Sequence, residues 1–383
     1  MWRIFLTICL LCWSADGQVR EVRCRNEKDE PVDWYIMYKA PGLQETYTNG
    51  LEYIYIDSKG KKKQTSTDHN KLIDDPNGVL ANTLKPIFKL TKDMPADFGF
   101  ISYSDQPPDG TAAGCTYGHS KGVVMMDKTT TGVWLLHSTP KFPFKRDNNF
   151  WPPSGVVNAQ TFICVTFKYE EFKKIGQHLL NIRAFPFDHQ IPKGFLEELI
   201  DVTEKKISPG DIIQKLTSAG GEASFRSIAK KLYKKSTPTT PRQDTLKDSK
   251  RFDGDLYRTI AETYSTIKKS NIDVRVQTWG QQRYREGSYC EQNQHQVINI
   301  ESVKADLGKE NGKWEVEWEP CNDHSKWCVA KDNNNNLICI ADVNRAVTQY
   351  ERPGGALCFE HQQASDLFKG LIAGTEDCPS PTP

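Results

Sequence analysis

GHSKGVVMM at residues 118–126 and DHSKWCVA at residues 323–330 share the tripeptide His-Ser-Lys. Each tripeptide continues into an apolar, β-branched run, which predicts a strand. A second apolar run lies upstream of each one, FGFISY at 98–103 and VRVQTW at 274–279. Because the same pattern occurs once in each half of the chain, the sequence predicts two similar halves that each contribute one His-x-Lys pair.

On a strand, residues i and i+2 point to the same face, so His119 projects with Lys121 and His324 with Lys326. If the two pairs face each other, one imidazole can attack phosphorus and form a covalent intermediate. The other imidazole, when protonated, can give its proton to the leaving oxygen. The two lysines can neutralise charge on the phosphoryl oxygens, so this chemistry needs neither a metal ion nor a cofactor. A single His-x-Lys is equally explained as a surface strand end.

The rest of the chain alternates between two kinds of apolar pattern. Aromatic and β-branched runs predict further strands at 32–38, 122–126, 132–137, 161–167, 297–300 and 337–340. Apolar residues spaced three and four apart predict helices at 169–181, 194–202, 225–233 and 256–268. Since strands and helices interleave, a mixed α/β fold is favoured.

Charge and hydropathy exclude two classes of protein. The 383 residues contain 50 Lys plus Arg and 49 Asp plus Glu, a net charge of +1 that excludes a uniformly basic coating protein. A mean hydropathy of −0.61 excludes a multi-span membrane protein. A local basic stretch runs from Lys230 to Arg251, around a proline-bearing insert at 234–250. It could bind DNA phosphates or be a solvated charged loop, and the sequence leaves both interpretations open.

The first residues have the pattern of a secretory signal peptide. A short basic start precedes the apolar run 4–13, and small residues at 15–17 predict cleavage after residue 17. A buried strand or helix and a membrane anchor are the alternatives. The run 4–13 is too short for a membrane anchor, because a transmembrane span needs about 20 apolar residues. Removal of Cys9 and Cys12 leaves nine of the 11 cysteines. In an oxidising compartment these are expected to form disulfides, with at least one thiol left over.

Motifs along most of the chain resemble the deoxyribonuclease II family of acid nucleases, within the phospholipase D-like superfamily. DHSKWCV at 323–329 followed by DVNR at 342–345 is the most specific signal. The other motifs that carry the resemblance are PVDWYIMYK at 31–39, DQPP at 105–108, GHSKGVVMMD at 118–127, GVWLLHSTPKFP at 132–143, AQTFICVTF at 159–167, FDGDLY at 252–257 and GGALC at 354–358.

The resemblance implies a phospholipase D-like pseudo-dimer, with half-domains at 18–190 and 191–383 and a shared central active site. It also implies metal-independent cleavage of DNA at acid pH, with no sequence preference, leaving 3′-phosphate and 5′-hydroxyl ends. The expected location is lysosomal or secreted, although no Asn-x-Ser/Thr glycosylation site occurs in the sequence. An inactive DNA-binding relative and another phospholipase D-like phosphodiesterase are the alternatives.

Individual residues match the family's motifs. His119, Lys121, His324 and Lys326 correspond to its catalytic residues, with His119 preferred as the nucleophile and His324 as the acid. Three further residues are candidates for supporting roles: His137, Gln160 and Asn344. The wider superfamily has an aspartate shortly after each catalytic lysine, and this chain has Met126 and Lys331 at those positions. The residues that orient the histidines are therefore expected to differ from those of the superfamily. At a lysosomal pH of about 5 one histidine must be protonated and the other neutral, which predicts two separated pKa values.

The resemblance also implies three disulfides: Cys24–Cys164, Cys290–Cys378 and Cys339–Cys358. Cys115 and Cys321 lie shortly before the two catalytic histidines. If those histidines face each other, a Cys115–Cys321 bridge between the halves is expected, which leaves Cys328 as a buried thiol.

Overall fold

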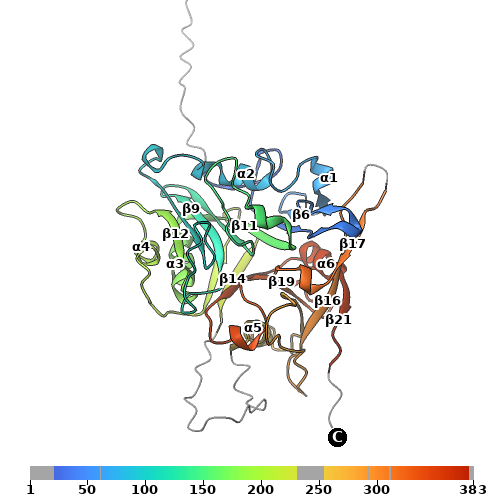
Figure 1. Cartoon of the computed structure of the whole chain (residues 1–383). Helices are drawn as coiled ribbons and strands as arrows, with labels where there is room; N and C mark the ends of the chain where they lie inside the picture. Colours follow the sequence, from blue (N-terminus) through green and yellow to red (C-terminus); the bar gives the residue numbers. More distant parts are fainter. Residues whose placement is uncertain (1–20, 61, 231–253, 292, 310–311, 379–383) are drawn as a thin grey trace, which may run out of the picture.

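The protein is described here from a computed structural model that covers residues 21–378, except 61, 231–253, 292 and 310–311. The expected signal peptide, the 234–250 insert and most of the basic stretch lie outside these residues. In the described part, no helix is both long enough and apolar enough to cross a membrane. Figure 1 shows the N-terminal half above the C-terminal half, with α2 at the top and α5 at the bottom.

The N-terminal half contains an antiparallel sheet of eight strands in the order β12-β8-β9-β10-β11-β3-β6-β7. Two short two-stranded sheets, β1-β2 and β4-β5, lie in the same half. The strands are β1 (Cys24–Arg25), β2 (Pro31–Val32), β3 (Trp34–Lys39), β4 (Gly42–Leu43), β5 (Thr48–Asn49), β6 (Tyr53–Asp57), β7 (Gln64–Thr65), β8 (Phe98–Ser104), β9 (Lys121–Asp127), β10 (Thr131–His137), β11 (Gln160–Lys168) and β12 (Pro186–Gln190).

The C-terminal half contains a sheet of nine strands in the order β13-β14-β20-β19-β18-β15-β16-β17, with β21 also paired to β16. Its pair β15–β16 is parallel, whereas the other pairs described are antiparallel. The strands are β13 (Ile213–Thr217), β14 (Ser224–Ala229), β15 (Val274–Gln277), β16 (Val297–Asp306), β17 (Glu315–Trp318), β18 (Trp327–Ala330), β19 (Leu337–Ala341), β20 (Gly355–Glu360) and β21 (Ile372–Thr375).

Four central strands have the same order in the two large sheets. The series β8-β9-β10-β11 corresponds to β15-β18-β19-β20, in the sheet and along the chain, and β3 and β14 lie next to β11 and β20. In each half the strand that starts at the His-Ser-Lys unit, β9 or β18, pairs on one side with the strand predicted upstream of it, β8 or β15, and on the other with the strand after it, β10 or β19. The prediction of a mixed α/β fold with two similar halves is therefore confirmed.

Helices lie between the sheets and on their outer faces. The helices α3 (Phe172–Asn181), α4 (Glu197–Thr203) and α6 (Gln362–Gly370) share one apolar core with residues of both sheets. The short helices α1 (Ser66–His69) and α2 (Val79–Leu84) belong to the N-terminal half, and α2 packs on the outer face of its sheet. The outer face of the C-terminal sheet is covered by α5 (Leu256–Lys268). Each sheet is thus buried on both faces.

One predicted helix is wrong. Residues 225–229 belong to strand β14, which is hydrogen-bonded to β13 on one side and β20 on the other. Phe225 and Ile228 have a helix-like spacing of three, but they enter different apolar cores on opposite faces of the sheet. A strand that is buried on both faces shows no clean alternation, so its apolar spacing can imitate a helix.

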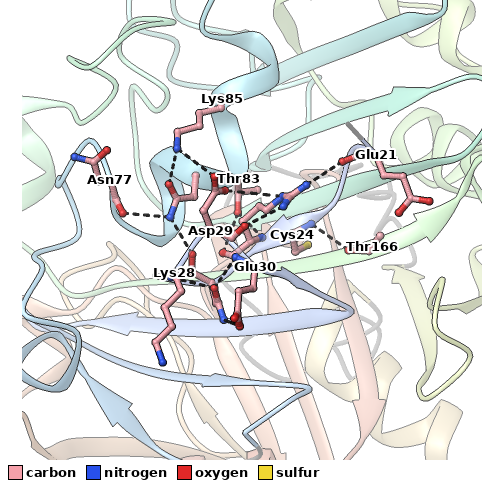
Figure 2. A network of polar contacts seen from close by, with 12 residues as sticks. Glu21, Cys24, Lys28, Asp29, Glu30, Asn77, Thr83, Lys85 and Thr166 are labelled. Carbon is pink, nitrogen blue, oxygen red and sulfur yellow. Dashed lines mark hydrogen bonds and ion pairs between the residues drawn. The ribbon is translucent and has the colours of Figure 1, made fainter. Parts of the chain in front are cut away.

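The N-terminal segment is attached to the first sheet by polar contacts (Figure 2) and also by a disulfide. The backbone N–H of Cys24 donates to Thr166 Oγ1 at 3.1 Å, and that of Arg25 donates to Thr83 Oγ1 at 3.0 Å. The disulfide Cys24–Cys164 joins β1 to β11 across a sequence separation of 140 residues. These contacts fix the start of the described chain against α2 and β11.

The Cys24–Cys164 bridge leads to a prediction on stability. The double variant Cys24→Ala/Cys164→Ala is expected to lose about 2–5 kcal/mol of unfolding free energy, because the bridge closes a long loop in the unfolded chain. Cys115→Ala, which removes an exposed free thiol, is the control and should stay within about 0.5 kcal/mol of the wild type. Denaturant unfolding followed by tryptophan fluorescence measures both. Equal unfolding midpoints for the two variants would contradict the prediction.

The other cysteines divide into two bridges and three thiols. Cys290–Cys378 and Cys339–Cys358 are bonded, while Cys115, Cys321 and Cys328 are free. The expected Cys115–Cys321 bridge is therefore wrong. Cys115 lies on an exposed loop, and the Cys321 thiol lies 3.7 Å from the Glu319 carboxylate. Cys328 is buried, as predicted.

Candidate active site

The two His-Ser-Lys units meet at the junction of the halves through reciprocal backbone contacts. The N–H of His119 donates to the carbonyl of Pro353, just before β20, at 3.1 Å. The N–H of His324 donates to the carbonyl of Ala159, just before β11, at 3.0 Å. Since β11 and β20 occupy equivalent places in the two sheets, each unit is held by the equivalent segment of the other half.

The first unit is organised by the carboxylate of Asp105, which directly follows β8. Asp105 Oδ2 lies 2.8 Å from His119 Nδ1, and Asp105 Oδ1 accepts from Lys121 Nζ at 2.6 Å. Arg352, from the other half, donates to Asp105 Oδ2 at 3.0 Å. The contact with Asp105 favours a proton on Nδ1 of His119, which leaves the Nε2 lone pair available. The His119 side chain remains 14% exposed, whereas those of Asp105 and Lys121 are 3% exposed.

The second unit has an aromatic neighbour where the first has a carboxylate. Tyr103 pairs with Gly122, and Gln277 pairs with Trp327, so the strand registers place Asp105 and Trp279 at equivalent positions. The Trp279 ring contacts the His324 imidazole edge to face, with centroids 4.5 Å apart. Among the side chains that the structure describes, none hydrogen-bonds the His324 ring. The two histidines therefore have chemically different surroundings.

Both imidazoles are held in the neutral form. Burial, aided by the charge of Lys121, lowers the pKa of His119 to about 3, although Asp105 opposes this shift. Burial, together with the charges of Lys326, Lys121 and His119, lowers the pKa of His324 to about 3. The predicted separation of the two pKa values is therefore not found. The physical reason is that each ring is buried among lysines from both units, whose positive charge disfavours protonation of both rings.

Three other buried groups respond to charges in the site. Burial and the charge of Lys121 lower the pKa of Lys326 to about 7. Burial raises the pKa of Asp342 to about 8, against the opposing charges of Lys121 and Lys326. The Lys121, His119 and Arg352 charges hold the pKa of Asp105 well below its usual range despite its burial. These mutual effects place residues of both halves in one electrostatic site.

The three candidates for supporting roles make different contacts. His137 is buried between the rings of Phe142 and Phe162, as in a core histidine. Gln160 Oε1 accepts a hydrogen bond from Ser138 at 2.6 Å. Asn344 Oδ1 accepts from the backbone N–H of Trp279 at 3.3 Å, so it supports the loop that carries the aromatic neighbour of His324.

One part of the basic stretch lies inside the described residues. Lys230 is buried, and its Nζ donates to the carbonyls of Gly254 and Tyr350. It is therefore a structural tie rather than an exposed contact for DNA. The remaining basic residues of 231–251 lie outside the described residues.

The residues that the sequence did not assign are Asp105, Trp279 and Arg352. Asp105 opens the DQPP motif, and its place directly after a predicted strand was the available signal. Arg352 gave no signal, because it reaches the site from the opposite half. In the part of the chain that the structure describes, no group of three or more His, Cys, Asp or Glu residues is placed to hold a metal ion.

Comparisons with known proteins match nearly the whole chain to one family. A family model described as deoxyribonuclease II matches residues 23–378. Human deoxyribonuclease-2-beta is 30% identical over 368 residues, which cover 93% of this chain and 92% of the relative. Plancitoxin-1 of Acanthaster planci is 28% identical, covering 98% and 97%, and cell-death-related nuclease 7 of Caenorhabditis elegans is 27% identical, covering 94% and 89%.

Among solved structures, yeast tyrosyl-DNA phosphodiesterase aligns with a TM-score of 0.29 and 8% identity, over 64% of this chain and 68% of that one. The match to the family model covers more of the chain than this structural alignment. It spans both halves and includes both His-Ser-Lys units. The chain belongs to the deoxyribonuclease II family.

Proposed function

We propose that this protein is an endonuclease that hydrolyses DNA phosphodiester bonds at acid pH without a metal ion, leaving 3′-phosphate and 5′-hydroxyl ends. The observation that carries the proposal is the convergence of two His-Lys pairs, one from each half, with Asp105 hydrogen-bonded to His119. The deoxyribonuclease relatives support DNA as the substrate.

In the first step, Nε2 of His119 attacks phosphorus, and the bond between phosphorus and the 5′ oxygen breaks. His324 gives a proton to that oxygen, which leaves as the 5′-hydroxyl. In the second step a water molecule, deprotonated by the now neutral His324, attacks the phosphohistidine. The bond between phosphorus and His119 then breaks and releases the 3′-phosphate.

The different surroundings of the histidines support this assignment. Asp105 orients the His119 ring and stabilises the positive charge that develops when Nε2 bonds to phosphorus. His324 has no such carboxylate, and its contact with Trp279 leaves the ring nitrogens free to exchange a proton. A bound phosphodiester adds negative charge beside His324, which raises the pKa of that ring from about 3 and generates the acid.

The lysines have a different task. Lys121 and Lys326 supply positive charge that stabilises the extra negative charge on the phosphoryl oxygens in the transition state. Lys121 is fixed by Asp105, and the Lys326 Nζ donates to the His324 carbonyl at 2.6 Å. Both ammonium groups are therefore placed before substrate arrives.

Lys326 leads to a prediction on pH dependence. Its pKa is lowered to about 7, so Lys326 is charged below that pH and neutral above it. Because kcat/KM reports groups of the free enzyme, its decline with rising pH starts with the loss of protonated His324 and is expected to steepen through about pH 7. Lys326→Arg should keep its charge and move this steeper fall to higher pH. Identical pH profiles for the wild type and this variant would assign the fall to another group.

The decisive experiment is incubation of the wild-type protein with supercoiled plasmid at pH 5 in EDTA, followed by analysis of the DNA ends. We expect nicked and linear products with 3′-phosphate ends. DNA that is bound but uncleaved would favour an inactive binding relative. Hydrolysis of phospholipid vesicles in place of DNA would favour another phosphodiesterase.

We further propose that the enzyme acts in lysosomes, or after secretion, on DNA from dying cells. The acid dependence expected of the site supports an acidic compartment, and the relative named cell-death-related nuclease 7 supports the source of DNA. Co-localisation of the tagged protein with a lysosomal marker tests the location. Retention of the protein in the cytosol would contradict it.

A further inference from the structure

We propose that Arg183 and Lys205 form a second contact for the DNA backbone, which binds a phosphate next to the one being cleaved. This inference rests on the proposed nuclease function. Both side chains line a cavity of about 80 Å³ bounded by Thr116 and Tyr117, by the end of α3 and by the segment after α4. Helices α3 and α4 lie at the left of Figure 1, beside β12.

The cavity is joined to the active site by direct contacts. The N–H of Gly118, the residue before His119, donates to the carbonyl of Arg183 at 3.0 Å. The Arg183 Nη1 donates to the carbonyl of Thr116 at 3.5 Å. From the other side, Arg352 Nε donates to the carbonyl of Tyr117 at 3.0 Å. The cavity therefore borders the loop that presents His119, and the firm contact between them is through the backbone of Arg183.

Aromatic rings extend this connection to Lys205. The Tyr117 and Phe185 rings meet edge to face with centroids 4.9 Å apart. The Lys205 Nζ lies 4.1 Å from the centroid of the Phe185 ring. A continuous line of contacts thus runs from Arg352 at the catalytic carboxylate, through Tyr117 and Phe185, to Lys205.

The charge of this surface suits an anionic ligand. Lys206 is paired with Asp201 at 2.6 Å and with Glu204 at 2.9 Å, so its charge is already balanced. In the described part of the chain, neither Arg183 nor Lys205 forms an ion pair. Arginine and lysine without carboxylate partners, beside a nuclease site, are the groups that neutralise DNA phosphates.

The apolar part of the cavity suits the rest of a nucleotide. Leu179, Leu180 and Val202 are buried in its wall, while Ile207 is 67% exposed at its margin. An apolar surface beside two cations can contact a sugar or base while the cations bind the phosphate. A free inorganic anion would not use Ile207, so the combination favours a nucleic acid strand.

The backbone at both cations ends a helix. Arg183, with φ of +48°, follows α3, and Lys205, with φ of +58°, follows α4, and a residue in the left-handed region is common at this position. Asparagine tolerates this region better, so a substitution by asparagine removes the charge without breaking the turn.

The test compares Arg183→Asn and Lys205→Asn with the wild type in DNA cleavage at pH 5 over a series of salt concentrations. Each variant is expected to raise KM several-fold, leave kcat near the wild-type value and reduce the slope of log(kcat/KM) against log[salt] by about 1. Hydrolysis of thymidine 3′-(4-nitrophenyl phosphate), which is too short to reach the cavity, should be unchanged. That result also shows that the variant is folded.

Matched variants sharpen the outcome. Lys206→Asn changes the neighbouring residue, whose charge is already paired, and should leave the salt slope unchanged. Arg183→Lys and Lys205→Arg should keep the wild-type slope. A wild-type protein that does not cleave DNA would overturn the proposed function. A wild type that cleaves DNA, with slopes that neither asparagine variant changes, would overturn this second contact alone.

Discussion

Replacement of His119 or His324 by alanine is expected to reduce plasmid cleavage at pH 5 by at least about 10⁴-fold, because each removes a group that makes or breaks a bond to phosphorus. The two histidines lie in one site built from both halves, so neither can replace the other. Circular dichroism and thermal unfolding of the purified variants are the controls for folding. Cleavage that survives both substitutions would reject the mechanism.

A substrate with a better leaving group separates the two roles. Thymidine 3′-(4-nitrophenyl phosphate) releases nitrophenolate, a stable anion that needs no proton from the enzyme. His324→Ala should therefore recover much of the first step on this substrate, while His119→Ala should not. The reverse pattern would exchange the two assignments.

The covalent intermediate offers a second readout. Without His324 to activate water, His324→Ala should accumulate a phosphorylated His119 during turnover of the nitrophenyl substrate. Mass spectrometry of peptides prepared at alkaline pH, where phosphohistidine survives, would locate the added nucleotide. A modification on His324 in the His119→Ala variant would contradict the proposed direction of attack.

The second large effect is expected for Asp105→Asn, which should lower kcat by about 10³-fold with little change in KM. Asparagine keeps the size of the side chain but removes the charge that orients His119, fixes Lys121 and pairs with Arg352. The nitrophenyl substrate should not rescue this variant, because the defect lies in the nucleophile and not in the leaving group.

Asp109→Asn is the matched control for Asp105→Asn. Asp109 lies on the same loop, is exposed and accepts a hydrogen bond only from Thr111 among the described residues. The lowered pKa of Asp105 also predicts a stability effect, since its ionised form favours the folded state above the ordinary aspartate pKa. At pH 5 Asp105→Asn should unfold at a lower temperature than Asp109→Asn. Equal activity of the two variants would remove Asp105 from the mechanism.

Much of the fold follows from short-range patterns. The strand at 98–103, the helix at 256–268 and both His-Ser-Lys strands lie where apolar spacing predicts them. The helix predicted at 225–233 failed because burial on both faces of β14 removed the alternation that identifies a strand. The strands β8, β9 and β18 are also buried, but their continuous apolar runs identified them, whereas the polar residues of β14 left a helix-like spacing.

The site depends on contacts that local pattern does not contain. The motifs predicted both histidines and both lysines as site residues, but Arg352 reaches Asp105 only after the two halves assemble. Contacts between the halves also explain why the pKa values of the two imidazoles are not separated, because Lys121 of one half lowers the pKa of His324 in the other. The Cys115–Cys321 bridge failed because Cys115 lies on an exposed loop while the Cys321 thiol lies against the Glu319 carboxylate.

The exchange of backbone hydrogen bonds between the halves has a consequence for how such a site can evolve. Two identical subunits related by a twofold axis would have to surround both histidines with the same residues. A single continuous chain is free of that constraint, so a carboxylate can stand beside His119 while an indole stands beside His324. A difference between the two histidines that exists before substrate binds is thus available to the joined chain and closed to a symmetric homodimer, in which only an asymmetric substrate could distinguish them.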